Sequence, residues 1–262
     1  FRFVDLRRHP APSGLAEPVV AAMAARLDAG EHCLVFLNRR GFAPVLVCNA
    51  CGWTADCDRC SARYTLHREP PRIVCHHCDR TRPVPTVCPA CGSDRLGPVG
   101  FGTQRLTSLL ARRFGTERLL RLDRDSAAGR GLAEGLARLR SGDPCVVVGT
   151  QMLAKGHDFP RLTLVAVANA DAGLLSVDFR GVERAAQTLT QVAGRAGRAD
   201  RPGEVWLQTL QPGHPALVTL AREGYGALAR ALLEERREAG WPPFAHLALL
   251  RAEAQDAAAA EE

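Results

Sequence analysis

Four C-x-x-C pairs constrain this chain more than any other feature of its sequence. They contain eight of the ten cysteines, and these are Cys48 and Cys51, Cys57 and Cys60, Cys75 and Cys78, and Cys88 and Cys91. Two thiols three positions apart can bind one metal ion from a single tight turn, and a structural zinc ion takes four ligands in a tetrahedron. The four pairs therefore predict two zinc ions, each held by four thiolates.

The spacing alone does not fix which pairs share a zinc ion. Sequential pairing would join the first pair to the second and the third to the fourth. Nested pairing would place the outer ligands Cys48, Cys51, Cys88 and Cys91 on one ion and the inner ligands Cys57, Cys60, Cys75 and Cys78 on the other. We predict nested pairing, because it closes the base of the insertion with a metal ion. His67, His76 and His77 are not needed as ligands, since eight thiolates fill two sites.

A disulfide framework is the alternative interpretation of these cysteines. The chain shows no secretory signal pattern, and its flanking sequence is typical of an intracellular nucleotide-dependent enzyme, which favours zinc. Cys33 and Cys145 stand alone beside apolar runs, so we expect them to be buried core thiols. No apolar run reaches the ~18 residues that a membrane span requires. We therefore expect a cytoplasmic protein without membrane contact.

The charge of the chain favours a polyanionic partner. Its net charge is +6 and its pI is about 9.0. Such an excess is compatible with nucleic acid but does not identify it. Among the 34 basic residues only Lys155 is a lysine. This exception suggests that position 155 requires the compact ammonium group of a lysine.

Around the cysteines, apolar runs alternate with segments of helical periodicity. The predicted strands are 32–38, 117–123, 144–150, 162–168 and 203–209, and the predicted helices are 15–29, 103–114, about 130–140, 178–196 and two within 214–239. This alternation is typical of a doubly wound parallel α/β sheet. The cysteine module interrupts the sheet after its first buried strand. Residues 241–253 predict a turn followed by a further strand.

Three polar segments lie where parallel sheets usually carry function, at strand ends or in the helices that follow. They are Asn38 to Gly41, the stretch GTQMLAKGHDFP at 149–160, and QVAGRAGR at 191–198. Taken singly, each also fits a structural role as a charged loop or a helix with salt bridges. In the third segment Arg195 and Arg198 are three positions apart, so on a helix they would share one face and could clamp phosphates.

Together these segments resemble a known set. QVAGRAGR matches the last motif of superfamily 2 helicases, Q-x-x-G-R-x-x-R, and GTQMLAKGHDFP resembles the motif before it. FLNRRG resembles the first motif of the second RecA-like lobe. With the eight cysteines, the combination closely resembles the PriA family of replication-restart helicases over residues 1–253.

The resemblance implies the fold and the division of the chain. It implies a RecA-like helicase lobe 2 with an inserted two-zinc module and the start of a C-terminal domain. The implied parts are 1–47 and 99–212 for the lobe, 48–98 for the zinc module, and 213–262 for a helical link into the C-terminal domain. The chain contains neither the G-x-x-x-x-G-K-[ST] phosphate loop nor the D-E-x-H motif of a first lobe. On its own it is expected to hydrolyse no ATP.

The resemblance also implies a function and roles for single residues. The family comprises ATP-dependent 3′→5′ DNA helicases that recognise abandoned forks and initiate primosome assembly on nucleoid DNA, with ATP and Mg²⁺ as cofactors. Primosome proteins and single-strand-binding protein are the implied partners, beside forked and single-stranded DNA. Arg198 matches the arginine finger and Arg195 is the second candidate. The implied nucleotide contacts are Gln191, Gly156 and Asp171, and Asp171 is expected to bridge the two later motifs. The implied DNA contacts are Arg39, Arg40, Thr150, Gln151, Lys155 and His157.

A binding scaffold is the competing hypothesis. In that case the basic charge, the zinc ions and the arginines would serve only fork DNA and partner proteins, without ATP hydrolysis. The sequence of the first lobe would distinguish the two hypotheses directly.

Overall fold

A six-stranded sheet forms the centre of the structure, and every pair of neighbouring strands in it is parallel. The strand order is β1-β11-β10-β2-β9-β8. The strands are β1 (Arg2–Asp5), β2 (His32–Phe36), β8 (Leu119–Leu122), β9 (Val146–Gly149), β10 (Leu162–Val167) and β11 (Glu204–Thr209). This computed structural model describes residues 1–37, 45–60, 62–68, 70–75, 77–98, 103–122, 135, 137–140, 142–149, 159, 161–176, 178–197 and 202–248.

The central strands β2, β9 and β10 are buried along their whole length. Their continuous apolar runs are typical of a parallel sheet that is covered on both faces. Successive side chains enter opposite layers, because Leu34 and Phe36 pack in one core cluster and Cys33 and Val35 in the other. The predicted α/β class with a parallel sheet is confirmed, whereas the assignment as a RecA-like lobe stays a prediction.

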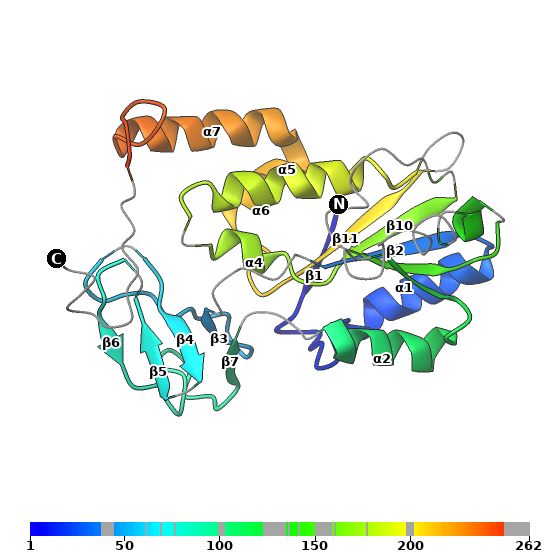
Figure 1. The fold of residues 1–262 in the computed structure, drawn as a ribbon, viewed down its shortest axis with the longest axis horizontal. Helices are drawn as coiled ribbons and strands as arrows, with labels where there is room; N and C mark the ends of the chain where they lie inside the picture. The colour runs from blue at the N-terminus through cyan, green and yellow to red at the C-terminus, as the bar shows by residue number, and fades with distance from the viewer. Residues whose placement is uncertain are drawn as a thin grey trace.

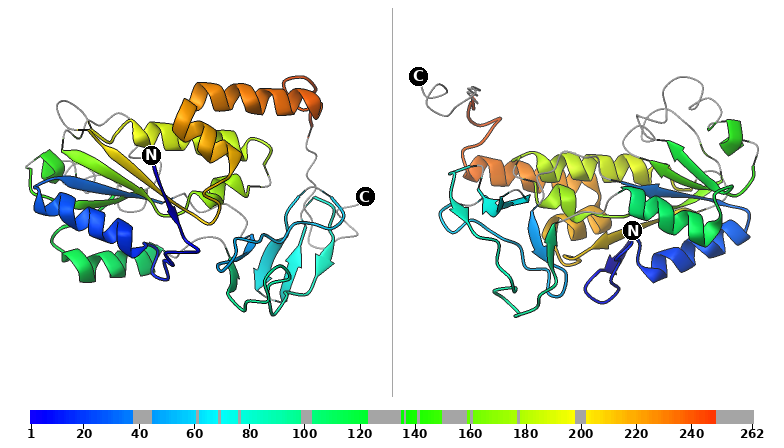
Figure 2. Two further views of the ribbon diagram at one scale, coloured as in Figure 1. Left: turned by 180° about the vertical axis from the view of Figure 1, so that it is seen from behind. Right: turned by 60° about the horizontal axis from the view of Figure 1, so that its bottom comes forward.

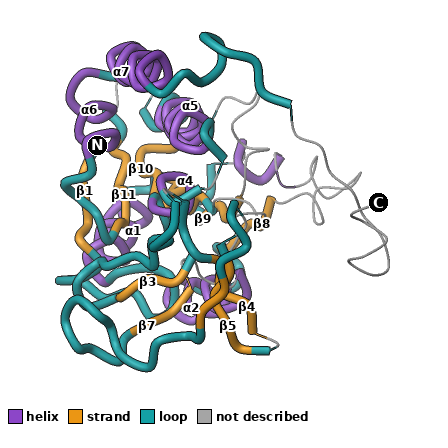
Figure 3. The backbone as a smooth tube through the Cα atoms, turned by 90° about the vertical axis from the view of Figure 1, so that its left-hand side faces the viewer, coloured by secondary structure: helices purple, strands orange, loops and turns teal. Residues whose placement is uncertain are grey.

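Helices cover both faces of the sheet (Figures 1 and 3). On one face lie α1 (Glu17–Asp28) and α2 (Thr103–Phe114), and on the other α5 (Gly181–Ala193), α6 (Pro215–Glu223) and α7 (Tyr225–Glu238). In α1 the buried residues Val19, Val20, Met23 and Leu27 form one stripe, and Gly30 at φ +77° follows the helix end. None of the described helices combines the length and the apolar character needed to cross a membrane.

Outside the cysteine-rich module, two predicted elements differ from the structure, and one short helix was not predicted. The helix expected at 178–196 begins at Gly181 and ends at Ala193. The strand expected within 241–253 does not appear in residues 241–248, which form turns and irregular chain, and 249–253 lie outside the described residues. The four-residue helix α4 (Asp171–Leu174) is too short to produce a periodic signal in the sequence.

The six-stranded sheet and the helices that cover it are called the lobe below. The cysteine-rich module consists of small antiparallel sheets beside the lobe (Figures 1 and 2). Its base is a pair of strands, β3 (Leu46–Cys48) and β7 (Leu96–Pro98). Its other sheet consists of β4 (Thr65–Arg68), β5 (Pro71–Val74) and β6 (Thr81–Arg82). Because the module follows β2 in the chain, it lies beyond the carboxyl edge of the main sheet.

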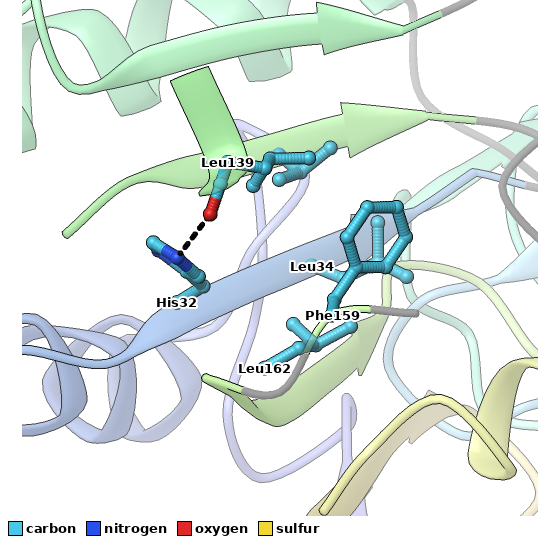
Figure 4. A pocket seen from close by; sticks show the side chains of 6 residues that line it. His32, Leu34, Leu139, Phe159 and Leu162 are labelled. Carbon is cyan, nitrogen blue, oxygen red and sulfur yellow. Dashed lines mark hydrogen bonds between the residues drawn. The ribbon is translucent and has the colours of Figure 1, made fainter. Parts of the chain in front are cut away.

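A small apolar cavity in the lobe contains one polar group, His32 (Figure 4). The amide of Cys145 donates to its Nδ1 at 3.3 Å, so the proton resides on Nε2, which donates to the carbonyl of Leu139 at 3.2 Å. Burial is the main cause that lowers the pKa of His32. His32 is therefore a neutral core residue with both ring nitrogens bonded, and it offers no atom to a ligand.

Candidate metal centres and strand-edge residues

Each C-x-x-C pair forms the same backbone turn. In all four pairs the amide of the first cysteine donates to the carbonyl five positions later, at 2.7–2.9 Å. In three pairs the residue four positions later donates back to the carbonyl of that first cysteine, and these residues are Gly52, Asp79 and Gly92. Their φ angles are +83°, +56° and +73°. Glycine occupies two of the positions because it adopts this left-handed conformation without steric cost.

The eight sulfur atoms form two groups of four, and in each group all sulfurs lie within 4.8 Å of one another. The first group, here the outer site, consists of Cys48, Cys51, Cys88 and Cys91, and the second, the inner site, consists of Cys57, Cys60, Cys75 and Cys78. In the outer site the Sγ–Sγ distances are 3.7 Å for Cys48 to Cys91 and 3.8 Å for Cys51 to Cys88. In the inner site they are 3.6 Å for Cys57 to Cys78 and 3.5 Å for Cys60 to Cys75.

These distances fit zinc. Zinc–sulfur bonds of ~2.3 Å in a tetrahedron place the sulfurs ~3.8 Å apart. A disulfide would require ~2.05 Å, and all ten cysteines are free thiols. The nested pairing is confirmed, and the two clusters support two zinc ions. Four protein ligands leave no open coordination position, so each ion would stabilise the fold and bind no substrate.

Thiol electrostatics in the inner site show why a cation suits it. Burial opposes ionisation of Cys57, but amide donors, first that of Arg59, outweigh it and lower its pKa to about 6. The Ala62 amide lowers the pKa of Cys60, but burial and the neighbouring thiols together raise it to about 12. The protein alone therefore favours few thiolates in this cluster, and a divalent cation would allow all four.

The histidines near the pairs do not join either cluster. His67 is half-buried on β4 and His77 is exposed, and neither belongs to the groups of possible ligands found among the described residues. His76 lies outside those residues. The structure thus agrees with the prediction that thiolates alone form the sites.

Asp58 is not a ligand of the inner site but stabilises it through hydrogen bonds. It lies between the ligands Cys57 and Cys60 and accepts hydrogen bonds from Tyr64 and from two arginines of the β5–β6 hairpin, Arg80 and Arg82. The hydrogen bond from Tyr64 is the main cause that lowers the pKa of Asp58. The carboxylate thus links the turn of Cys57 and Cys60 to β6, the strand that follows the turn of Cys75 and Cys78.

Most of the predicted nucleotide and DNA contacts lie outside the described residues. These are Arg39, Arg40, Thr150, Gln151, Lys155, Gly156, His157 and Arg198. The described ends of the strands show where these segments begin: 38–44 follow the carboxyl end of β2, and 150–158 follow that of β9. Since β2 and β9 are adjacent and parallel, both segments start at the same edge of the sheet.

Asp171 has a structural position that the sequence did not suggest. Its side chain is buried, with one carboxylate oxygen accepting from the Thr209 hydroxyl and the other from the Leu210 amide at 2.8 Å. Burial is the main cause that raises the pKa of Asp171. The carboxylate therefore fixes α4 to the end of β11 and presents no exposed oxygen to a nucleotide, which corrects its assignment as a nucleotide contact.

Gln191 and Arg195 lie at the other end of the sheet. Gln191 is exposed on α5, and Arg195 follows the helix in a turn. The turn forms because Gly197 adopts φ +70° and its amide donates to the carbonyl of Leu162 at 2.8 Å, at the start of β10.

Two expectations are thus corrected. Arg195 is not on a helical face shared with position 198, because α5 ends at Ala193. Asp171 follows the carboxyl end of β10, whereas the segment of Arg195 contacts its amino end, so Asp171 does not bridge the two motifs.

Sequence reasoning missed Gln208, which is completely buried at the carboxyl edge. Its Oε1 accepts from the amide of Ala16 at 2.6 Å, and its Nε2 donates to the carbonyls of Gly14 and Ala168 at 2.9 Å each. It therefore holds the loop before α1 against the ends of β10 and β11. The only signal was a polar pair, Gln208-Thr209, at the end of an apolar strand.

Comparison with known proteins agrees with this architecture. A family profile described as the PriA DNA helicase Cys-rich region (CRR) domain matches residues 57–83. The replication restart protein PriA of Haemophilus influenzae is 47% identical over 98% of this chain, which covers 36% of that protein. The protein of the same name from Bacillus subtilis is 38% identical over 88% of the chain, which covers 29% of it.

The fold and the site define an α/β protein with a parallel sheet and an inserted module of two tetrathiolate centres. The comparisons then identify the family: the chain belongs to the replication restart protein PriA family. It spans about a third of the length of these relatives, since the covered shares are 36% and 29%.

Proposed function

We propose that the protein to which this chain belongs is an ATP-dependent 3′→5′ DNA helicase that recognises abandoned forks and initiates primosome assembly. The observation that carries the proposal is the match to replication restart proteins along nearly the whole chain, 47% identical over 259 residues. The Cys-rich region of a PriA DNA helicase is matched within it, where the structure forms the inner site. Its partners would be forked and single-stranded DNA, primosome proteins and single-strand-binding protein, in the cytoplasm.

In this proposal the chain is the second RecA-like lobe and contributes to a nucleotide site that it does not complete. ATP and Mg²⁺ would bind chiefly to a first lobe, which this chain does not contain. Arg198 would stabilise the charge on the transferred phosphate, with Arg195 and Gln191 beside it. The anchored turn at Gly197 supports this role, because a short turn held to β10 can present arginine side chains in a fixed direction.

The loops at the carboxyl edge of β2 and β9 would bind DNA. Arg39 and Arg40 follow the first strand, and Thr150, Gln151, Lys155 and His157 follow the second. Contacts of this kind go mainly to phosphates, because arginine and lysine neutralise backbone charge and release counterions. DNA affinity is therefore expected to fall steeply as salt concentration rises.

The experiment is an activity assay of the full-length protein on forks and on partial duplexes with either a 3′ or a 5′ single-stranded tail. We expect DNA-stimulated ATP hydrolysis and unwinding only of the duplex whose tail permits 3′→5′ movement. Fork binding without any ATPase activity would refute the helicase and favour the scaffold hypothesis.

A further inference from the structure

The zinc module is joined to the lobe through a strand that belongs to two hydrophobic cores. Val45 and Val47 are buried in the cluster of the main sheet, whereas Leu46 between them is buried in the small core of the module. Alternate residues of a strand point to opposite faces, so β3 binds the two bodies together along its length. The same strand ends at Cys48, the first ligand of the outer site.

The first turn of the outer site also touches the lobe directly. A Cβ atom at Gly52 would lie 2.9 Å from the carbonyl oxygen of Leu210 and 3.7 Å from Cδ of Arg7. The Leu210 amide is itself held by the buried carboxylate of Asp171 at 2.8 Å. The turn therefore abuts backbone that is fixed at the carboxyl edge of the main sheet.

The charges at this contact are complementary. Four thiolates around Zn²⁺ leave a net charge of about −2 on the outer site. Arg7 lies beside the turn, and Asp5 orients its guanidinium through bonds from Nε at 2.8 Å and from NH2 at 2.7 Å.

We propose that Gly52, Arg7 and Leu210, with β3, form a rigid joint that fixes the zinc module on the carboxyl edge of the sheet, so that module and lobe move as one body. In this arrangement the outer zinc ion stabilises the orientation of the module as well as its fold. The inner ion stabilises the small core of the module, in which Leu46 of β3 is buried. If the protein is a helicase as proposed above, DNA held by the module would move with the second lobe.

The chain offers a matched pair of variants to test the joint. Gly52 and Gly92 occupy the same position in the two turns of the outer site, with φ +83° and +73°. A Cβ at Gly92 meets no atom within 4 Å, whereas one at Gly52 meets Leu210. Gly52→Ala and Gly92→Ala therefore introduce similar backbone strain, and only Gly52→Ala disturbs the contact with the lobe.

Two quantities are measured on the full-length protein: amide hydrogen exchange and zinc content. Both variants should retain two zinc ions. In Gly52→Ala the amides of β3 and of Leu210 should exchange at least ~10-fold faster than in Gly92→Ala, because the joint opens locally. Equal exchange in the two variants would overturn the proposal.

A third variant covers the case in which Gly52→Ala loses zinc. Arg7→Leu removes the guanidinium without touching a ligand or a turn. It should raise exchange at Leu210 and in β3 while both zinc ions remain bound. If neither region changes in Arg7→Leu, the charge of Arg7 has no part in the joint and the proposal is wrong in that respect.

Discussion

The lobe and the zinc module hold their backbones in place by different means. The lobe has two extensive apolar clusters, one on each face of a parallel sheet. Among the described residues of the module, the buried core cluster consists of Leu46, Ala55, Tyr64, Ile73 and Cys75, and cysteine ligands pack around them. A core of that size cannot offset the conformational entropy of the module, so metal ligation must supply the difference. A core substitution should therefore lower the stability of the lobe only in part, whereas loss of zinc should unfold the module completely.

Removal of zinc should produce the largest effect and should separate the two regions. Structural zinc sites contribute about 10 kcal/mol or more to the folding of zinc-finger peptides. After chelation, we expect the amides of β4 and β5 to lose protection from exchange while those of β2 and β10 keep it. Cys33→Ser, in the lobe, is the control and should leave both zinc ions in place. Loss of protection throughout the sheet would show that the regions are not separate.

The second prediction concerns catalysis, which we place in the lobe and not in the module. In the full-length protein Arg198→Ala should reduce ATP turnover by ~10³-fold, the scale of an arginine finger. Arg198→Lys should rescue little, because an ammonium group lacks the planar fork of a guanidinium. The assay is DNA-stimulated ATPase activity, with fork affinity and zinc content measured on the same preparation and expected to be unchanged.

A control for this variant lies on α5, the helix that precedes Arg198 in the sequence. Arg184 is an exposed residue of α5 that pairs with Asp178 at 2.6 Å. Arg184→Ala should leave ATP turnover close to that of the unmodified protein. Turnover within a few-fold of normal in Arg198→Ala would show that Arg198 is not the finger.

The third prediction tests whether the lobe responds in a graded way. Leu164 is completely buried in β10, and truncation of a buried leucine costs about 2–5 kcal/mol. Leu164→Ala should lower the free energy of unfolding of the lobe by this amount, measured by urea denaturation, and leave zinc content at two. A parallel loss of zinc from this variant would contradict the separation of the regions.

The smallest expected effect is a pH dependence confined to the lobe. Burial lowers the pKa of His32 below its usual 6.5, so below that pH the unfolded chain binds a proton that the folded chain excludes. The stabilising contribution is therefore complete above pH 6.5 and is lost as the pH falls, by at most about 1.4 kcal/mol per pH unit.

His32→Leu should remove this slope although it lowers stability at every pH. The measurement is amide exchange of β2 and β9 as a function of pH, because these strands report on the lobe alone. His214 is the comparison, since burial lowers its pKa too, and its contribution should remain in the His32 variant. An unchanged slope in His32→Leu would show that His32 does not cause the pH dependence.

The features that the sequence predicted well are those with a repeated signal. Continuous apolar runs marked the buried strands, and C-x-x-C spacing marked the ligands, because each signal recurs with a fixed period or distance. Nested pairing was reached by considering how an insertion closes. The strands of the module were not predicted, since β6 and β7 have only two and three residues and carry no alternation.

The errors arose where a single contact decides the conformation. The end of α5 depends on Gly197, whose amide binds the start of β10 from a distant part of the sequence. Asp171 resembled an exposed loop acid, but Thr209 and Leu210 enclose it only after the sheet forms. Neither partner can be recognised from local sequence.

The most direct test of the account is zinc content in paired cysteine variants. Cys51 and Cys88 share the outer site, and Cys57 belongs to the inner site. Elemental analysis should give two zinc ions for the unmodified chain and one for the double variant Cys51→Ser, Cys88→Ser. It should give none for the double variant Cys51→Ser, Cys57→Ser. Sequential pairing would reverse these two results, and that reversal would contradict the account.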